Sequence, residues 1–211
     1  MKQLLMMMAL EMKQFSLMKE LLDILYHPAG YIHPDRLPEG WVNTGTSSHP
    51  LLNRWIIMKY CTLSTIDNGW YPDEVNMTFL KYWHVLPSAA YFIGAKLLHA
   101  RLLENGQYLR LDEALQEFIK LPLPPLTSSG GALATVSNHK LSGEALPVAG
   151  GKLLLSAMKT LPDALYQRAL LLFPLSEIVI DKDFINDINS SNLINMAINY
   201  AQHFSNESRP N

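Results

Sequence analysis

PSAAYFIGAKLLHARLLENG, residues 87–106, carries the clearest helical pattern in the chain. Pro87 suits the first turn of a helix, and Asn105-Gly106 is a typical end signal. The residues that recur along one side at helical spacing are Tyr91, Gly94, Leu98, Arg101 and Leu102. Small residues at 90, 94 and 95 allow a neighbouring helix to approach closely. The stretch therefore predicts a fold built from helices packed on helices.

The rest of the chain repeats this periodicity and has no long run of strict alternation, so a mainly α fold is expected. Proline and aspartate mark several helix starts. The asparagine-rich last helix is expected to break near Ser190-Ser191, because asparagine is a poor helix former. Beyond the first, the helices are expected over 50–63, from 72 to before 87, 87–105, 112–120, 152–160, 162–173 and 181–204.

Residues 121–151 differ from their surroundings, with four prolines, five glycines and few large apolar side chains. Connections of this length are usually functional or mobile. We therefore expect a single irregular helical domain over 26–204, in which 121–151 forms a long Gly/Pro-rich connection, and a candidate hinge, between two helical halves. Gly150-Gly151-Lys152 lacks the spacing of a phosphate-binding loop.

The first 25 residues predict a separate amphipathic helix, in which Phe15, Met18, Leu22 and Leu25 share one side. That side must find either the core or a partner, and the core is the favoured alternative. The apolar run at 4–10 is too short for a secretory signal or a membrane helix, so a cytoplasmic protein is expected. The tail at 205–211 is expected to be disordered.

The composition narrows the function without identifying it. Hydrophobic residues make up 48% of the 211 residues, which suffices for a continuous core. The 17 basic residues nearly balance the 19 acidic ones and are scattered, so neither nucleic acid nor direct membrane insertion is expected. The single cysteine, Cys61, excludes an internal disulfide and is expected to be a small buried hydrophobe.

Residues 26–38 form a short, stiff segment with prolines at 28, 34 and 38. It holds cationic, anionic and apolar groups but no nucleophile beside a base. Its signature residues are Tyr31, His33, Pro34, Arg36 and Leu37. Two interpretations stay open: a structural hook that fixes the first helix to the core, or a direct contact with a partner.

This signature resembles the N-terminal motif of the SctK family (OrgA/MxiK/PscK-like) of type III secretion accessory proteins. Two further stretches fit in the same order, namely Trp83-x-x-Leu86-Pro87-x-x-Ala90-Tyr91-x-x-Gly94 and Leu171-Leu172-Phe173-Pro174. The resemblance covers roughly residues 26–204 and is closest to the OrgA-like branch.

The resemblance implies a non-enzymatic adaptor in the cytoplasmic sorting platform of an injectisome. Such a protein would link the cytoplasmic domain of the inner-membrane ring protein to the pod protein. It would therefore be required for protein secretion and virulence, and would lie in the cytoplasm beside the inner membrane. No cofactor is implied.

Two other classes of function remain as alternatives. A small metal-dependent hydrolase would use His27, His33 and Asp35, provided that the segment curls back on itself. A type III secretion chaperone would be expected to be smaller, more acidic and dimeric. The chain has no Gly-x-Ser-x-Gly elbow and no His pair at helical metal-ligand spacing.

Overall fold

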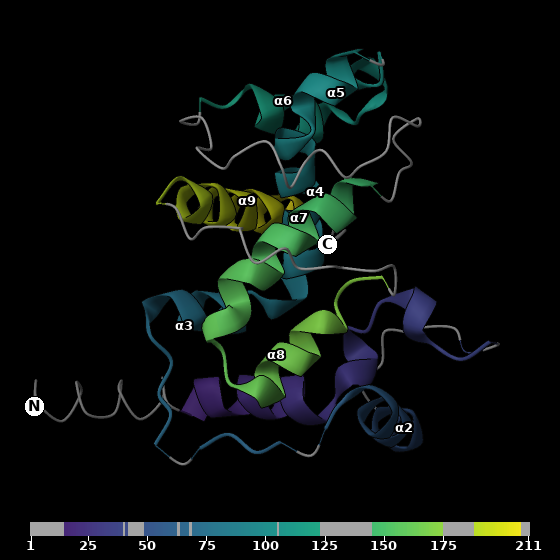
Figure 1. Ribbon diagram of the computed structural model, residues 1–211, viewed down its shortest axis with the longest axis vertical. Coiled ribbons are helices and arrows are strands. Elements are labelled where there is room, and N and C mark those ends of the chain that lie inside the picture. The colour runs from purple at the N-terminus through teal and green to yellow at the C-terminus, as the bar shows by residue number, and fades with distance from the viewer. Residues whose placement is uncertain are drawn as a thin grey trace, which may run out of the picture. The chain divides into compact units, whose positions relative to one another are not determined.

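The computed structural model describes residues 15–39, 41, 49–62, 64–67, 69–104, 106–122, 145–174 and 188–207. Over these residues the chain is helical, with short 3-10 turns and no strand (Figure 1). The predicted mainly α fold is confirmed.

The chain divides into two compact units, and neither is continuous in sequence. The first unit contains residues 1–83 and 160–172, and the second contains residues 84–159 and 173–211. The chain passes from one unit to the other at three places. Two of them lie inside the 3-10 turns η3 (Trp83–Val85) and η5 (Met158–Thr160), and the third follows Leu172. The predicted halves on either side of 121–151 do not coincide with these units.

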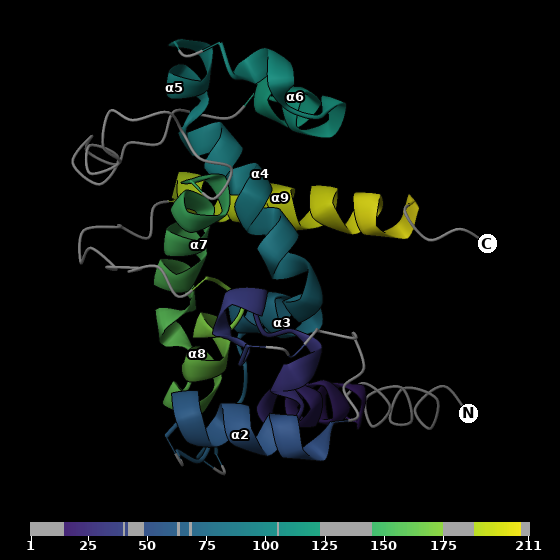
Figure 2. The ribbon, with the colours of Figure 1, turned by 90° about the vertical axis from the view of Figure 1, so that its right-hand side faces the viewer.

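The first unit is built on the helix of residues 15–26. The 3-10 turns η1 (Pro28–Gly30) and η2 (Pro34–Arg36) follow it, and then α2 (Pro50–Tyr60), α3 (Glu74–Lys81) and α8 (Asp163–Leu170). Helix α8 lies beside the helix of residues 15–26 (Figures 1 and 2). The Ala29 N–H donates a 2.8 Å hydrogen bond to the Asn53 side-chain oxygen, which holds η1 on α2.

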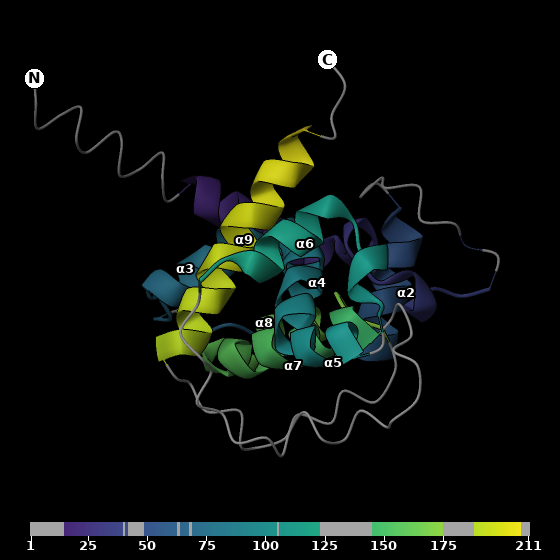
Figure 3. The ribbon, with the colours of Figure 1, turned by 90° about the horizontal axis from the view of Figure 1, so that it is seen from above.

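The second unit centres on α4 (Leu86–Leu97), which packs along α7 (Ala145–Ala157) and is crossed by α9 (Ile188–Glu207) (Figures 2 and 3). The remaining elements are α5 (His99–Glu104), η4 (Tyr108–Arg110) and α6 (Glu113–Lys120). The helix predicted over 87–105 is thus interrupted at Leu98, which forms a turn between α4 and α5.

Small residues bring the α4 and α7 backbones into direct contact, as the sequence predicted for 90 and 94. A β-carbon added at Gly94 would stand 1.9 Å from the Leu146 carbonyl oxygen. Real atoms do not approach so closely, so only glycine fits here. The crossing occupies the centre of the second unit's core, where Ala90, Ile93 and Leu154 are fully buried.

Polar side chains cap several helix ends, at positions close to those predicted from the sequence. Asp73 accepts the Asn76 N–H at 2.7 Å, and Asp112 accepts the Leu115 N–H at 2.8 Å, so both carboxylates are N-caps. At the other end of α6, the Lys96 ammonium donates to the carbonyl oxygens of Ile119 and Leu121 at 2.5 and 2.8 Å. A cation at this end also complements the helix dipole.

Three sequence predictions need correction. Residues 145–151 are not part of a long connection but form the first turns of α7, because packing against α4 outweighs the poor helix propensity of Gly150-Gly151. Residues 123–144 lie outside the described part of the chain.

Helix α9 runs through Ser190-Ser191 without a break, and Ser190 is buried. It also continues to Glu207, because a packed helix adds residues at low cost; the tail at 208–211 lies outside the described residues.

The apolar side of the first helix does not enter the core, contrary to the favoured alternative. Phe15, Met18 and Leu22 are 77%, 56% and 46% exposed, and of this helix only Ile24 is fully buried. Leu21 and Leu25 are half-buried, so it is the side formed by Phe15, Met18 and Leu22 that is available to a partner. Residues 1–14 of the predicted N-terminal helix lie outside the described residues.

Candidate functional site

Tyr31 fastens the signature segment to the end of the first helix. Its hydroxyl donates a 2.5 Å hydrogen bond to the carbonyl oxygen of Ile24, one of the helix-terminal carbonyls that lack a helical partner. Its ring meets Trp83 edge to face, with 5.8 Å between the ring centroids. Burial raises the pKa of this hydroxyl well above its usual value, so the group stays protonated as a donor. This geometry favours a structural hook for Tyr31.

The remaining signature residues form a turn that is most exposed at Pro34. The His33 N–H donates to the Leu171 carbonyl oxygen at 2.8 Å, and the His33 ring accepts the Asp35 N–H at 3.3 Å. Pro34 opens η2, and both Pro34 and Asp35 are exposed. The segment is therefore buried at its start and solvated at its tip.

Arg36 and Leu37 close this turn at half-buried positions. The Arg36 guanidinium carbon lies 5.7 Å from the centroid of the Tyr60 ring, within range of a cation–π interaction. The Tyr60 hydroxyl donates to the Arg36 carbonyl oxygen at 2.8 Å. Burial lowers the pKa of Arg36, and the charge remains. Contact with α2 thus fixes the arginine while leaving part of it accessible.

Each of the three sequence stretches that carried the resemblance contributes at least one residue to the first unit. Tyr31 from the first stretch contacts Trp83 from the second, and His33 is hydrogen-bonded to Leu171 from the third. The first stretch therefore contacts one residue of each of the other two, although the three are far apart in the sequence.

The metal-site alternative is wrong for the residues that it named. His27 pairs with Asp23 at 3.1 Å, whereas His33 pairs with Asp35 at 3.5 Å. Across the described ranges, no three His, Cys, Asp or Glu side chains are grouped so that they could hold a metal ion. The η1 and η2 turns lead the segment onward instead of curling it back, so His27, His33 and Asp35 do not converge.

The structure also shows the surroundings of Cys61 and of the Gly150-Gly151-Lys152 stretch. Cys61 is half-buried rather than buried, and burial raises its pKa, which disfavours the nucleophilic thiolate. Gly150 and Gly151 are buried inside α7 and do not form a phosphate-binding loop. In the part of the chain that the structure describes, no helix combines the length and apolar character needed to cross a membrane.

Each unit carries a pocket of its own. In the first unit, a pocket of about 590 Å³ opens beside the helix of residues 15–26. Its walls come from this helix, α2, α8 and the loop after α2. Apolar, hydroxyl-bearing and charged residues line it, among them Met18, Leu22, Ile57, Thr62, Ser64 and Arg168. Neither this pocket nor the role of Arg168 in it was expected from the sequence, because an arginine within a helix normally indicates a solvated face.

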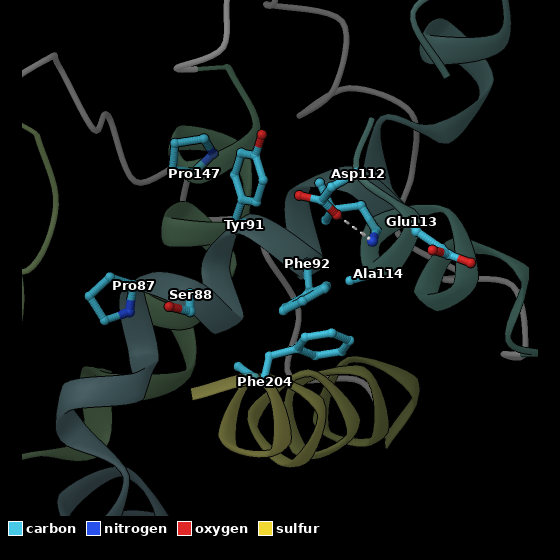
Figure 4. Close-up of a pocket in the computed structure, with 11 residues that line it drawn as sticks. Pro87, Ser88, Tyr91, Phe92, Asp112, Glu113, Ala114, Pro147 and Phe204 are labelled. Carbon is cyan, nitrogen blue, oxygen red and sulfur yellow. Dashed lines mark hydrogen bonds between the residues drawn. The ribbon is translucent and has the colours of Figure 1, made fainter. Parts of the chain in front are cut away.

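In the second unit, a pocket of about 770 Å³ lies where α4, α6, α7 and α9 meet (Figure 4). The rings of Phe92 and Phe204 lie next to each other in this pocket, with 6.1 Å between their centroids. Phe92 also packs against Phe118 and Tyr200, at 5.1 and 5.2 Å between centroids. Phe92 and Phe204 of this aromatic cluster give the pocket an apolar floor.

Carboxylates occupy one side of this second pocket. Asp112 and Glu113 are exposed at the start of α6, and the dashed line in Figure 4 marks the capping bond from the Leu115 N–H to Asp112. Tyr91 lies on the opposite side, next to Pro147. Burial, and secondarily the Asp112 charge, raises the pKa of Tyr91. The pocket thus offers an apolar floor with a negative rim.

Comparison with known proteins agrees with the resemblance drawn from the motifs. A family model described as bacterial type III secretion apparatus protein (OrgA_MxiK) matches residues 21–203. The chain is 28% identical over 192 residues to the oxygen-regulated invasion protein OrgA of Salmonella typhimurium strains 14028s, SL1344 and LT2, with 87% of each chain covered. No solved structure matches the chain. The chain therefore belongs to the OrgA/MxiK family of bacterial type III secretion apparatus proteins.

Proposed function

We propose that the protein is a non-enzymatic adaptor of the cytoplasmic sorting platform. It links the cytoplasmic domain of the inner-membrane ring protein to the pod protein, and lies in the cytoplasm beside the inner membrane through these contacts. The observation that carries this proposal is the presence of two compact units, each with its own open and largely apolar pocket. An adaptor needs two separate binding surfaces, and apolar pockets are the usual location of binding hot spots.

The exposed apolar residues add support for binding surfaces. In the first unit, Phe15, Leu51, Met58 and Tyr71 are all more than two-thirds exposed, at 77%, 80%, 74% and 69%. In the second unit, Leu109 is 79% exposed. Single exposed apolar residues are ordinary, but Met18, Leu22 and Tyr26, which are 56%, 46% and 59% exposed, line the first pocket together.

The direct test is co-purification of the chain with the ring protein's cytoplasmic domain and with the pod protein. Thr65 and Ser88 are exposed residues on the walls of the first and second pockets, so Thr65→Trp and Ser88→Trp should each fill one pocket without entering the core. We expect each variant to lose one partner and keep the other.

Matched controls place the same large side chain elsewhere. Ser16→Trp in the first unit and Ser191→Trp in the second replace exposed serines that line neither pocket, and both should keep both partners. In bacteria, deletion of the gene should abolish secretion of all substrates of the apparatus and disperse the pod protein in the cytosol. Normal pod localisation in that strain, or failure of the intact chain to bind either partner, would exclude the adaptor function.

A further inference from the structure

Arg168 is a buried cation with incomplete hydrogen bonding. It belongs to α8 and is 5% exposed. Among the residues that the structure describes, its guanidinium donates two hydrogen bonds, to the carbonyl oxygens of Ala164 at 3.3 Å and Leu25 at 3.4 Å. The Nε–H of Arg168 has no partner, and no carboxylate in the described part of the chain forms an ion pair with it.

Such an arrangement is energetically unfavourable in the free protein. Both hydrogen bonds are longer than the usual 2.9–3.0 Å for an N–H donor and are therefore weak. The Leu25 carbonyl lies at the end of a helix, whose partial negative charge offsets only part of the cation. A buried charge without a counter-charge costs several kcal/mol in a protein. An incoming carboxylate would remove that cost.

Arg168 is nevertheless one of the residues that line the pocket of the first unit, so a carboxylate bound in this pocket would lie beside its side chain. The Ser64 hydroxyl lines the same pocket, is buried, and likewise has no hydrogen-bond partner. Two unsatisfied donors thus accompany apolar walls from Met18, Leu22 and Ile57. Asp67 also lines the pocket, but it is exposed and forms no ion pair with Arg168.

We propose that this pocket docks a segment of a partner protein that places an Asp or Glu side chain on Arg168 and Ser64. The apolar residues flanking that acidic side chain would lie against Met18 and Leu22, which are 56% and 46% exposed. A carboxylate fits the site because a guanidinium can hold its two oxygens with two parallel hydrogen bonds. A single arginine and one hydroxyl among apolar walls do not match the greater charge of a phosphate group.

This inference rests on the proposed function in one respect, namely that the partner is the ring protein's cytoplasmic domain or the pod protein.

The substitution Arg168→Met removes the charge and keeps much of the side-chain volume. Truncating one member of a buried charge pair costs about 2–5 kcal/mol of binding, so affinity for one partner should fall by at least about 30-fold. Affinity for the other partner should stay unchanged.

Thermal unfolding distinguishes docking from a structural role. If Arg168 serves docking, the free Arg168→Met chain should melt at the same temperature as the wild type or higher, because an uncompensated charge is removed. Arg54→Met, which replaces an exposed arginine of α2, is the control and should keep both partners. An Arg168→Met chain that binds both partners with full affinity would overturn the inference and leave the adaptor function standing.

A second measurement needs no protein partner and uses the intact wild-type chain. Acetyl-Leu-Glu-Leu-amide is titrated to millimolar concentration while the Arg168 Nε–H resonance is followed by NMR, with the Leu-Gln-Leu peptide and inorganic phosphate as comparisons. We expect the glutamate peptide alone to shift this resonance. No shift, or an equal shift with the glutamine peptide or phosphate, would overturn the inference, even if the chain bound neither secretion partner.

Discussion

Gly150 meets the backbone of Ala90 so closely that an added β-carbon would stand 1.8 Å from the Ala90 carbonyl oxygen. The contact is reciprocal, since Gly94 of α4 stands in the same relation to Leu146 of α7. The two helices therefore interlock at two points, and the distance between their axes is set by the absence of side chains. The core of the second unit depends on this spacing.

The first prediction follows directly: Gly150→Ala should destabilise the protein. The alanine gains about 1 kcal/mol in helix propensity, but it forces two backbones apart in a packed core, and overpacking costs about 1–3 kcal/mol or more. We expect a net loss of at least about 1 kcal/mol in the free energy of unfolding, measured with urea. Gly69→Ala, where a β-carbon would meet nothing within 4 Å, is the control and should change little.

The second prediction concerns the hydroxyl of Tyr31. Tyr31→Phe keeps the ring against Trp83 but leaves the Ile24 carbonyl oxygen buried without this donor, which should cost about 1–3 kcal/mol. Tyr71→Phe removes the hydroxyl of a tyrosine that is 69% exposed and should be neutral. Equal stability of the two variants would show that the hydrogen bond to Ile24 does not anchor the first helix.

The third prediction uses the raised pKa of Tyr31. The unfolded chain releases this proton near pH 10.0, whereas the folded protein retains it. Above that pH the unfolded state binds fewer protons than the folded state, so the free energy of unfolding falls as the pH rises. The stabilisation is complete below the unfolded pKa. Urea unfolding of the wild type and Tyr31→Phe at about pH 9 and about pH 11 should show a smaller loss in the variant.

Much of the fold could be predicted because local chemistry determines it. Asp73 and Asp112 lie where helix starts need side-chain acceptors, and both act as caps. The start of α7 could not be predicted, since Gly150-Gly151 indicates a loop until α4 is known to lie against it. Helical stability there comes from tertiary packing, which a local pattern does not contain.

The candidate sites show the same division between local and long-range causes. The signature from Tyr31 to Leu37 was visible as a stiff segment, but its split into a buried hook and an exposed tip depends on Trp83 and Leu171. Arg168 carries no local signal, because its hydrogen bond to Leu25 and its place in the pocket depend on the first helix, which is distant in the sequence. Whether the exposed tip contacts a partner stays a prediction.

The fourth prediction tests that tip through Arg36. Its half-buried position over Tyr60 lies between the two extremes of a buried ion pair and a fully exposed contact. Arg36→Ala should therefore cost about 0.5–1 kcal/mol of stability, the usual value of an exposed cation–π interaction. If the tip also contacts a partner, pull-down of the ring or pod protein should weaken as well. Arg54→Ala, at an exposed position of α2, is the matched control.

If Arg36→Ala retains both stability and binding, the segment after His33 is a turn with no further role. A loss of several kcal/mol would instead indicate that Arg36 neutralises a buried charge. Chemical denaturation and pull-down of the same preparation separate these outcomes.

The interleaving of the two units has a consequence for how the protein is made. The first 83 residues lack α8 until the ribosome has synthesised the 76 residues from 84 to 159, which belong to the other unit. The second unit in turn waits for α9, the last helix of the chain. The first unit is complete only after residue 172 and the second only after α9, so neither unit can fold early in synthesis as N-terminal domains usually do. A premature stop codon anywhere before residue 160 would leave both units incomplete, so nascent chains should depend on chaperones until synthesis is nearly finished.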